Sequence, residues 1–294
     1  GGTPSVNNFP LAQDTAVFDN TGSVTGTITT VIDYAYPTID MSARTSAMSL
    51  QPAATSIYGN WLNGAGTTLL GGQLITFVKR GTQTITSAGK TFTTPITTNS
   101  LTGTVQLADA LVVSSGNGIT FTSGTFTAGA NNITSPAFAN SGTTGACVIN
   151  MGSGTWTATS SGTAWNFATT TGLTLNRQTA NILLSNTTTA ARTFAGGGLS
   201  YNKLTIGGAT GTSTTTFSGA NTFTELASTK TVAHTVALSA TSQVIGKWSI
   251  TGTAGNLVTV SGTNLSIAGA RVSGVDYLAM GTTTISTSSS GEFY

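Results

Sequence analysis

Few residues in this sequence could do chemistry, and the carboxylates are the first to consider. Glycoside hydrolysis needs two acidic side chains within roughly 5 to 10 Å of each other. After residue 110 the only acids are Glu225, Asp276 and Glu292, and their spacing does not place them together. The early acids are closer in sequence, in two pairs: Asp14 with Asp19, and Asp33 with Asp40. We interpret these pairs as solvated structural residues, so we predict no catalytic carboxylate pair and no calcium-assisted lyase site.

The single cysteine and the single histidine cannot form a zinc site or an intrachain disulfide. Cys147 lies beside Val148 and Ile149, where a thiol behaves as a small apolar residue. His234 has the same two-residue parity as Val232 and Val236, which places it on an inward face. We therefore predict a buried thiol and a hydrogen-bonded core histidine instead of a nucleophile and its base.

Two glycine-containing segments resemble anion-binding loops, but the residues around them do not fit such a loop. Ala88-Gly-Lys-Thr91 matches the end of a phosphate loop, but Thr84 stands where the first glycine is required and no helical pattern follows. We interpret Lys90 as a corner residue and Gly196-Gly-Gly198 as a turn between strands. No Gly-x-Ser-x-Gly elbow occurs in the sequence. The residues therefore predict no catalytic, cofactor or metal site.

The composition favours a folded chain that is almost without charge. Of 294 residues, 37 are Gly, 63 Thr and 31 Ser, while only 6% are charged and the net charge is +2. Hydrophobic residues make up 38% and the mean hydropathy is +0.17, which excludes the composition of a disordered chain. The ten basic residues form no basic run, which argues against nucleic-acid binding. No apolar run reaches about 18 residues, so we expect no membrane insertion.

Short stretches with an apolar residue at every second position recur along the chain. Thr fills the positions between, where its branched Cβ suits a pleated strand and its hydroxyl stays in water. Each stretch covers only a few residues, and corners rich in Gly, Asn and Ser separate them. The clearest examples are Ile119-Thr-Phe-Thr122, Thr155-Trp-Thr157, Leu173-Thr-Leu175, Leu204-Thr-Ile206 and Val258-Thr-Val260. This pattern predicts an all-β protein.

The spacing of the corners selects the architecture. Gly-Thr steps followed by an apolar residue fall near residues 81, 103, 124, 154, 172, 211, 252 and 262. Very short strands turned by Gly and Asn corners, with an imperfect repeat, are typical of a right-handed parallel β-helix. A β-sandwich would have longer strands and tight hairpins. We predict about nine rungs after residue 60 on this spacing.

The segment before residue 61 differs from the rest of the chain in charge and proline content. Four of the eight acids and four of the six prolines lie there. A solenoid needs a cap because an open end rung exposes unpaired backbone groups. We therefore expect an N-terminal cap over residues 1–60 and a β-solenoid over residues 61–294, although the two could form one continuous domain. Asp40 and Arg44 are close enough in sequence to pair across this cap.

Threonine and tryptophan side chains raise two further binding hypotheses. Flat arrays of Thr-x-Thr can order water and bind ice, and Thr120/Thr122, Thr155/Thr157 and Thr214/Thr216 fit locally. The drifting repeat argues against a fixed Thr position in every rung, so we interpret Thr and Ser as an uncharged coat. The four tryptophans could stack on sugars, but core packing is their commoner role; they are Trp61, Trp156, Trp165 and Trp248.

Several segments together resemble virion-associated proteins of tailed phages, chiefly those of uncultured aquatic phages. The resemblance covers most of the chain, and related sequences continue beyond Gly291-Glu-Phe-Tyr294, where this one stops. The segments are Ala16-Val-Phe-Asp19, Ile39-Asp-Met-Ser-Ala-Arg-Thr45, Tyr58-Gly-Asn-Trp61, Gly81-Thr-Gln-Thr-Ile85 with Gly89-Lys-Thr-Phe92, Gly197-Gly-Leu-Ser-Tyr-Asn-Lys-Leu-Thr-Ile206, Gly252-Thr-Ala-Gly-Asn256 and Val275-Asp-Tyr-Leu278.

The resemblance implies a large β-helical fibre, appendage or structural protein, and similar segments also occur in bacterial surface adhesins. It carries over no catalytic residue. We accordingly expect a non-enzymatic structural and recognition protein on a virion surface, as a fibre, spike or head-surface component. The expected partners are other copies of the chain, as a trimer or an end-to-end stack, other virion proteins and a host surface glycan.

Two other functions remain open on the sequence. The first is a self-assembling extracellular filament or adhesin subunit whose rungs stack end to end, again without enzymatic activity. The second is a polysaccharide depolymerase, which requires at least two acids within about 10 Å in a groove. An acid pair lining a groove would favour the depolymerase.

Overall fold

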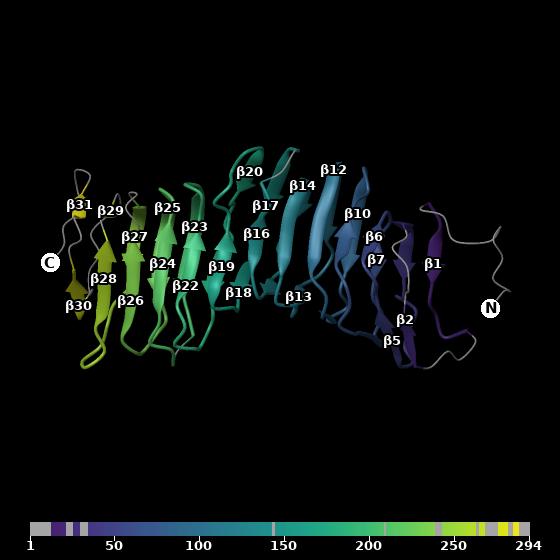
Figure 1. Cartoon of the computed structure of the whole chain (residues 1–294), viewed down its shortest axis with the longest axis horizontal. Coiled ribbons are helices and arrows are strands. Elements are labelled where there is room, and N and C mark those ends of the chain that lie inside the picture. Colours follow the sequence, from purple (N-terminus) through teal and green to yellow (C-terminus); the bar gives the residue numbers. More distant parts are fainter. Residues whose placement is uncertain are drawn as a thin grey trace.

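The computed structural model describes residues 13–21, 26–29, 35–142, 145–208, 210–238, 243–262, 265–267, 276–281 and 285–287. In this part of the chain the regular elements are β-strands, with no helix, and the strands pair in parallel. They form a β-solenoid of about eleven turns, which confirms the predicted fold class. Figure 1 shows the strands side by side along the longest axis of the molecule, from β1 near the N-terminus to β31 near the C-terminus.

The strands stack in three columns. The first column contains β3 (Ala35–Tyr36), β6 (Thr55–Ile57), β9 (Ile75–Phe77), the first parts of β12 (Ile96–Leu107) and β14 (Ile119–Thr127), β16 (Phe138–Asn140), β19 (Gly162–Asn166), β22 (Arg192–Ala195), β24 (Thr214–Ser218), β26 (His234–Leu238), β28 (Val258–Gly262) and β30 (Leu278–Met280). The second column contains β1 (Thr15–Val17), β4 (Thr38–Asp40), β7 (Trp61–Leu62), β10 (Thr82–Thr86), the second parts of β12 and β14, β17 (Cys147–Asn150) and β20 (Leu173–Asn176).

The third column begins with a separate three-stranded sheet and continues as a ten-stranded sheet. The three strands are β2 (Thr27–Thr29), β5 (Met48–Gln51) and β8 (Thr67–Leu69). The ten are β11 (Thr91–Phe92), β13 (Leu111–Val113), β15 (Ile133–Ser135), β18 (Thr155–Ala158), β21 (Asn181–Leu184), β23 (Ser200–Ile206), β25 (Thr222–Ser228), β27 (Gln243–Ser249), β29 (Leu265–Ile267) and β31 (Ile285–Thr287). Among the described strands the second column ends at β20, so the later turns contribute two strands each.

The first three Gly-Thr steps found in the sequence, at 81, 103 and 124, align in register. Thr82 pairs with Thr104, and Thr104 pairs with Thr125, each directly after the glycine of its step. Gly124 has φ +80° and lies at the bend of β14, where a residue with a Cβ is rarely accommodated. Between these steps the ladder shifts register within the β12–β14 pair, at Asn99, and resumes at Thr104, so the bend of the strand absorbs the change in spacing.

The parallel ladder runs without a break across residue 60. β1 pairs with β4, and Ile39 of β4 pairs with Trp61 of β7. The described strands before residue 60 thus belong to the same stack as those after it. A separate cap over residues 1–60 stays a prediction.

A nearly continuous stack of aromatic rings fills the interior of the middle turns, from Phe121 to Phe223. Trp165 stacks on Phe167 at a centroid distance of 4.7 Å and on Phe194 at 5.7 Å, and it also contacts Phe138 and Tyr201. The register explains this stack, because Phe138, Trp165, Phe194 and Phe217 occupy one inward position on successive strands. All four tryptophans are at most 1% exposed, which confirms core packing over a sugar-stacking role.

Replacing Trp165 with alanine should cost about 3–5 kcal/mol in the free energy of unfolding, because it opens a cavity in the middle of the aromatic stack. The measurement is urea denaturation followed by fluorescence. Leu257→Ala is the control, since Leu257 is 47% exposed and its truncation should change stability by at most about 0.5 kcal/mol. If the two variants lose the same unfolding free energy, the aromatic stack does not contribute the stability predicted for it.

Candidate recognition surface

A charged ladder crosses three neighbouring strands of the third column. Lys203 of β23, Glu225 of β25 and Lys247 of β27 pair in register, so their side chains stack along the axis at about 4.8 Å per strand. The Nζ of Lys203 lies 3.2 Å from Oε2 of Glu225, and the Nζ of Lys247 lies 3.6 Å from Oε1. One carboxylate therefore holds an ammonium group on each side.

Arg177 adds a third cation to this face. Its Nη1 donates to the carbonyl oxygen of Tyr201 at 2.6 Å and to Oγ1 of Thr224 at 2.7 Å, which fixes the guanidinium across two turns. We call Arg177, Lys203, Glu225 and Lys247 the charged strip. Its formal charge is +2.

A local departure from strict alternation accompanies the strip in three successive strands. In each strand two consecutive residues face outward and a buried apolar residue follows. The three segments are Asn202-Lys203-Leu204, Thr224-Glu225-Leu226 and Gly246-Lys247-Trp248. The outer face therefore carries an extra outward-facing position beside each charged residue, which widens its polar surface.

The ion pairs keep Glu225 ionised. Burial opposes its charge, but the Ser249 hydroxyl, the hydrogen bond and positive charge of Lys203 and the charge of Lys247 together hold the pKa of its carboxyl below the ordinary value. The exposed fractions of the side chains are 37% for Lys203, 20% for Glu225 and 66% for Lys247. The two ammonium groups are accessible to a ligand, while the carboxylate lies between and partly beneath them.

Sequence reasoning missed the charged strip, although a signal for it exists. Lys203, Glu225 and Lys247 are equally spaced in the sequence, and the same interval separates Gly81 from Gly103. The strand register shows that one turn of the solenoid spans this interval at both places. Charged residues that repeat at this interval must therefore stack on a common face.

The other acids mostly serve the backbone around them. Asp109 accepts hydrogen bonds from the amides of Ser87 and Ala88, both at 2.7 Å, and so ties its own turn to the preceding corner. Asp19 and Asp40 lie on neighbouring turns, and each accepts a bond from the amide two residues further on. Asp14 directly precedes β1. Asp276 lies two residues before β30. Asp33 and Glu292 lie outside the described residues.

The expected pair between Asp40 and Arg44 is wrong. Arg44 is 1% exposed, and its guanidinium donates to the carbonyl oxygens of Asp19, Ser46 and Ala47. The corner around Arg44 offers converging backbone carbonyls that need donors, and a buried guanidinium supplies several at once. Asp40 instead accepts bonds from the amide and the hydroxyl of Ser42.

A second buried cationic group joins three later turns. Arg192 is 1% exposed, and it donates to the carbonyl oxygens of Leu184 at 2.7 Å and Asn186 at 2.9 Å and to Oγ of Ser213 at 3.1 Å. Lys230, 6% exposed, donates to the carbonyl oxygens of Gly208 and Gly211. Within the described part of the chain, no carboxylate forms an ion pair with either cation. Backbone carbonyl dipoles and the hydroxyl of Ser213 solvate these charges.

His234 lies beside this group on the inward face, as predicted. It is 4% exposed, and its ring nitrogens lie 3.0 Å from Oγ of Ser228 and 2.9 Å from the carbonyl oxygen of Val232. Burial lowers its pKa, and the positive charges of Lys230 and Arg192 lower it further. The histidine is therefore a neutral core residue at pH 7.

Stability should rise with pH above pH 8. Burial, aided by the charge of Arg192, lowers the pKa of Lys230 from 10.5 to about 8. Between these values the unfolded chain binds more protons than the folded chain, so the free energy of unfolding should increase by up to ~1.4 kcal/mol per pH unit. Lys230→Met should remove this increase in denaturation series at pH 7, 8 and 9.

A second titration opposes the first above pH 9. Burial raises the pKa of Cys147 from 9.0 to about 11, so in that range the folded chain keeps a proton that the unfolded chain loses. The difference between wild type and Lys230→Met isolates the lysine, because both carry Cys147. A pH-independent difference would contradict the lysine's role.

Three further interpretations of single residues and turns agree with the structure. Cys147 is 3% exposed, as expected of a thiol that acts as an apolar residue. Lys90 lies in the turn between β10 and β11, and its Nζ donates to the carbonyl oxygen of Ala65. The glycines at 196–198 form the turn between β22 and β23, where Gly197 and Gly198 have φ of +68° and +75°.

The threonine ladders are interrupted, but not for the reason that the sequence suggested. Among the described strand pairs the register shifts only within β12–β14 and β19–β22, and Thr residues do recur at paired positions such as Thr82, Thr104 and Thr125. Other residue types enter the ladders: Thr120 stacks on Ala139, Thr157 on Leu183 and Thr216 on Ala237. The outer faces are therefore mixed polar surfaces and not threonine-only arrays.

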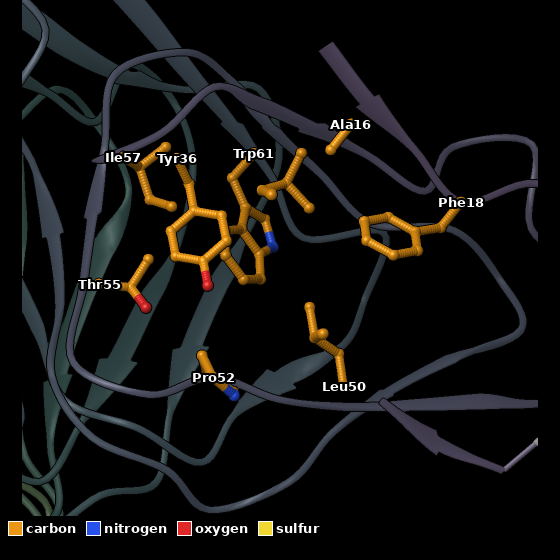
Figure 2. Close-up of a pocket in the computed structure, with 9 residues that line it drawn as sticks. Ala16, Phe18, Tyr36, Leu50, Pro52, Thr55, Ile57 and Trp61 are labelled. Carbon is orange, nitrogen blue, oxygen red and sulfur yellow. The ribbon is translucent and has the colours of Figure 1, made fainter. Parts of the chain in front are cut away.

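An apolar cavity of about 130 Å³ lies inside the N-terminal turns (Figure 2). Figure 2 shows the rings of Phe18, Tyr36 and Trp61 around it, from separate turns. The other lining residues are Ala16, Ile39, Leu50, Pro52, Thr55 and Ile57. Cavities lined in this way stay dry, and among the described lining residues the polar side-chain groups are two hydroxyls and the indole N–H. The cavity is a packing feature and carries no reactive group.

Among the described residues, no group of three or more His, Cys, Asp or Glu side chains could hold a metal ion. The described part also contains no helix that could cross a membrane. The comparisons with known proteins leave the family open: no family model matches the chain, and neither the curated proteins nor the solved structures give a significant match.

Proposed function

We propose that this chain is a non-enzymatic structural and recognition protein of a virion surface, as a tail fibre, spike or head-surface component. The observation that carries the proposal is the parallel ladder, which runs through about eleven turns around a hydrophobic core. Such a stack resists bending and proteolysis, because each turn is hydrogen-bonded to both neighbours.

The outer surface suits weak, repeated contacts. It is uncharged over most of its length and offers hydroxyl and amide groups at regular intervals along the axis, as in the side-chain bonds that join Thr127, Asn150 and Asn176. Sugars are recognised through such groups. We propose a host surface glycan as the target, with affinity gained by oligomerisation, as a trimer or with other virion proteins.

A second candidate is an extracellular filament or adhesin subunit that assembles end to end. Large apolar side chains are exposed near both ends of the described stack. Val17 on β1 is 59% exposed, and Met280 on β30 is 41% exposed. Apolar contact between successive copies would cover them.

Light scattering and negative-stain microscopy of the purified chain separate the two candidates. The virion component predicts discrete rods of fixed length or a closed trimer with a fixed mass. Open-ended polymers whose length grows with protein concentration would replace it with the filament.

A further inference from the structure

We propose that the charged strip is the binding site for an acidic polysaccharide, laid along the solenoid axis with its carboxylates on Lys203 and Lys247. The inference rests on the proposed recognition function and names the ligand class. It follows from the charge distribution, the geometry of the strip and the groups that surround it.

The net positive charge of the chain is concentrated at this place, because residues 177–247 carry a formal charge of +4 while the whole chain carries +2. No charged residue occurs between residues 110 and 176, whereas residues 177–247 contain five basic residues and one acid. Two of the five, Arg192 and Lys230, are buried within the same turns. No carboxylate of the described residues forms an ion pair with either side chain. Their positive charges therefore add to the positive potential of this segment. An acidic ligand is therefore drawn to these turns.

The strip leaves donors free for a ligand. Each ammonium group has three N–H donors; Glu225 occupies one donor of Lys203 at 3.2 Å, and at 3.6 Å it attracts Lys247 without a hydrogen bond. Lys247 is the more open of the two, with 66% of its side chain exposed. The contact with Glu225 restricts the conformations of both lysine side chains before a ligand binds. The lysines therefore lose less conformational entropy when the ligand binds.

Glu225 also selects the spacing of acidic groups in the ligand. A ligand carboxylate directly over Glu225 is repelled, while carboxylates over Lys203 and Lys247 are attracted. The two lysines are two strands apart, roughly 9.6 Å. The strip therefore favours a polymer in which neutral and acidic sugars alternate over one that is acidic at every sugar.

The surroundings favour a polysaccharide over a nucleic acid. Asn202 and Thr224 lie beside the charged residues and offer uncharged hydrogen-bonding groups to sugar hydroxyls. The aromatic rings of the same strands face the core, since Tyr201, Phe223 and Trp248 are at most 1% exposed. Single-stranded nucleic acids are bound by exposed aromatic platforms and by many cations. The charged strip has a formal charge of only +2 and no exposed aromatic ring, so it lacks both features of a nucleic-acid site.

Affinity electrophoresis of the full chain tests the site. The gels contain hyaluronate, which alternates acidic and neutral sugars, polygalacturonate, which is acidic at every sugar, or neutral dextran; binding of single-stranded DNA is measured in parallel. Hyaluronate should retard the protein most, and added salt should weaken the binding. The double variant Lys203→Ala/Lys247→Ala should bind hyaluronate about tenfold more weakly.

The matched control is Lys79→Ala/Arg80→Ala, which removes two cations at a corner before β10 and should bind hyaluronate as wild type does. Glu225→Gln removes the repulsion of a carboxylate above this position, so the difference in affinity between hyaluronate and polygalacturonate should become smaller. Equal loss in both double variants, a preference for dextran, or a preference for DNA would each overturn the inference. A preference for dextran would leave the proposed recognition function standing, whereas concentration-dependent polymers in light scattering would overturn that function itself.

Discussion

Gly152→Ala should lose about 4 kcal/mol or more of unfolding free energy, an effect that few single substitutions reach. Gly152 follows β17 with φ +76°, and a Cβ there would lie 1.6 Å from the carbonyl oxygen of Gly129 on the preceding turn. That oxygen accepts a hydrogen bond from the amide of Ser153. The new methyl group cannot be accommodated unless the two turns separate, and separation breaks the ladder at this corner.

The control for this substitution is Gly89→Ala. Gly89 has φ +71°, almost the same backbone conformation, and a Cβ there would meet nothing within 4 Å. Its replacement should cost only the left-handed strain of about 1–2 kcal/mol. Urea denaturation of the two variants separates contact between turns from backbone strain. Similar losses in both would mean that the close approach of successive turns is not the constraint.

Arg192→Met should cost about 3–5 kcal/mol, because it removes the guanidinium bonds to the carbonyl oxygen of Asn186 and to Oγ of Ser213 and leaves the carbonyl oxygen of Leu184 with the amide of Gly207 as its donor. Methionine retains part of the apolar stem, so the loss measures the guanidinium bonds more than the packing. Unfolding free energies by urea denaturation provide the comparison, and the variant should also become more susceptible to proteases near residues 184–213.

Arg80→Met is the matched control for Arg192→Met. Arg80 is exposed beside β10, and its replacement should change stability by at most about 0.5 kcal/mol. A wild-type stability for Arg192→Met would show that the carbonyls of Leu184 and Asn186 do not depend on this cation.

The fold could be predicted because its causes are local. Alternation over stretches such as Ile119–Thr122 and the Gly-Thr steps at 81, 103 and 124 are visible in the sequence, and each fixes a strand or a corner. The number of turns was harder to predict, since the corners vary in length and the second column stops after β20. Nothing in the residues after Asn176 marks that change by itself.

The charged strip and the buried cations could not be predicted from residue type. Arginine and lysine usually remain exposed, yet Arg44, Arg192 and Lys230 are buried by corners whose carbonyls converge on them. That convergence depends on backbone geometry in turns far apart in the sequence. The equal spacing of Lys203, Glu225 and Lys247 was visible, but its meaning depends on knowing that this interval makes one turn of the solenoid.

The most direct test of a recognition protein without enzymatic activity is to follow the polysaccharide itself. The purified chain is incubated with the polysaccharide that it binds most strongly in affinity electrophoresis. The length of the polymer and the number of its reducing ends are measured over time. We predict stable binding with an unchanged polymer length and no new reducing ends. Progressive shortening of the bound polymer would contradict the account and favour a depolymerase, with Asp19 and Asp40 on neighbouring turns as the first residues to replace.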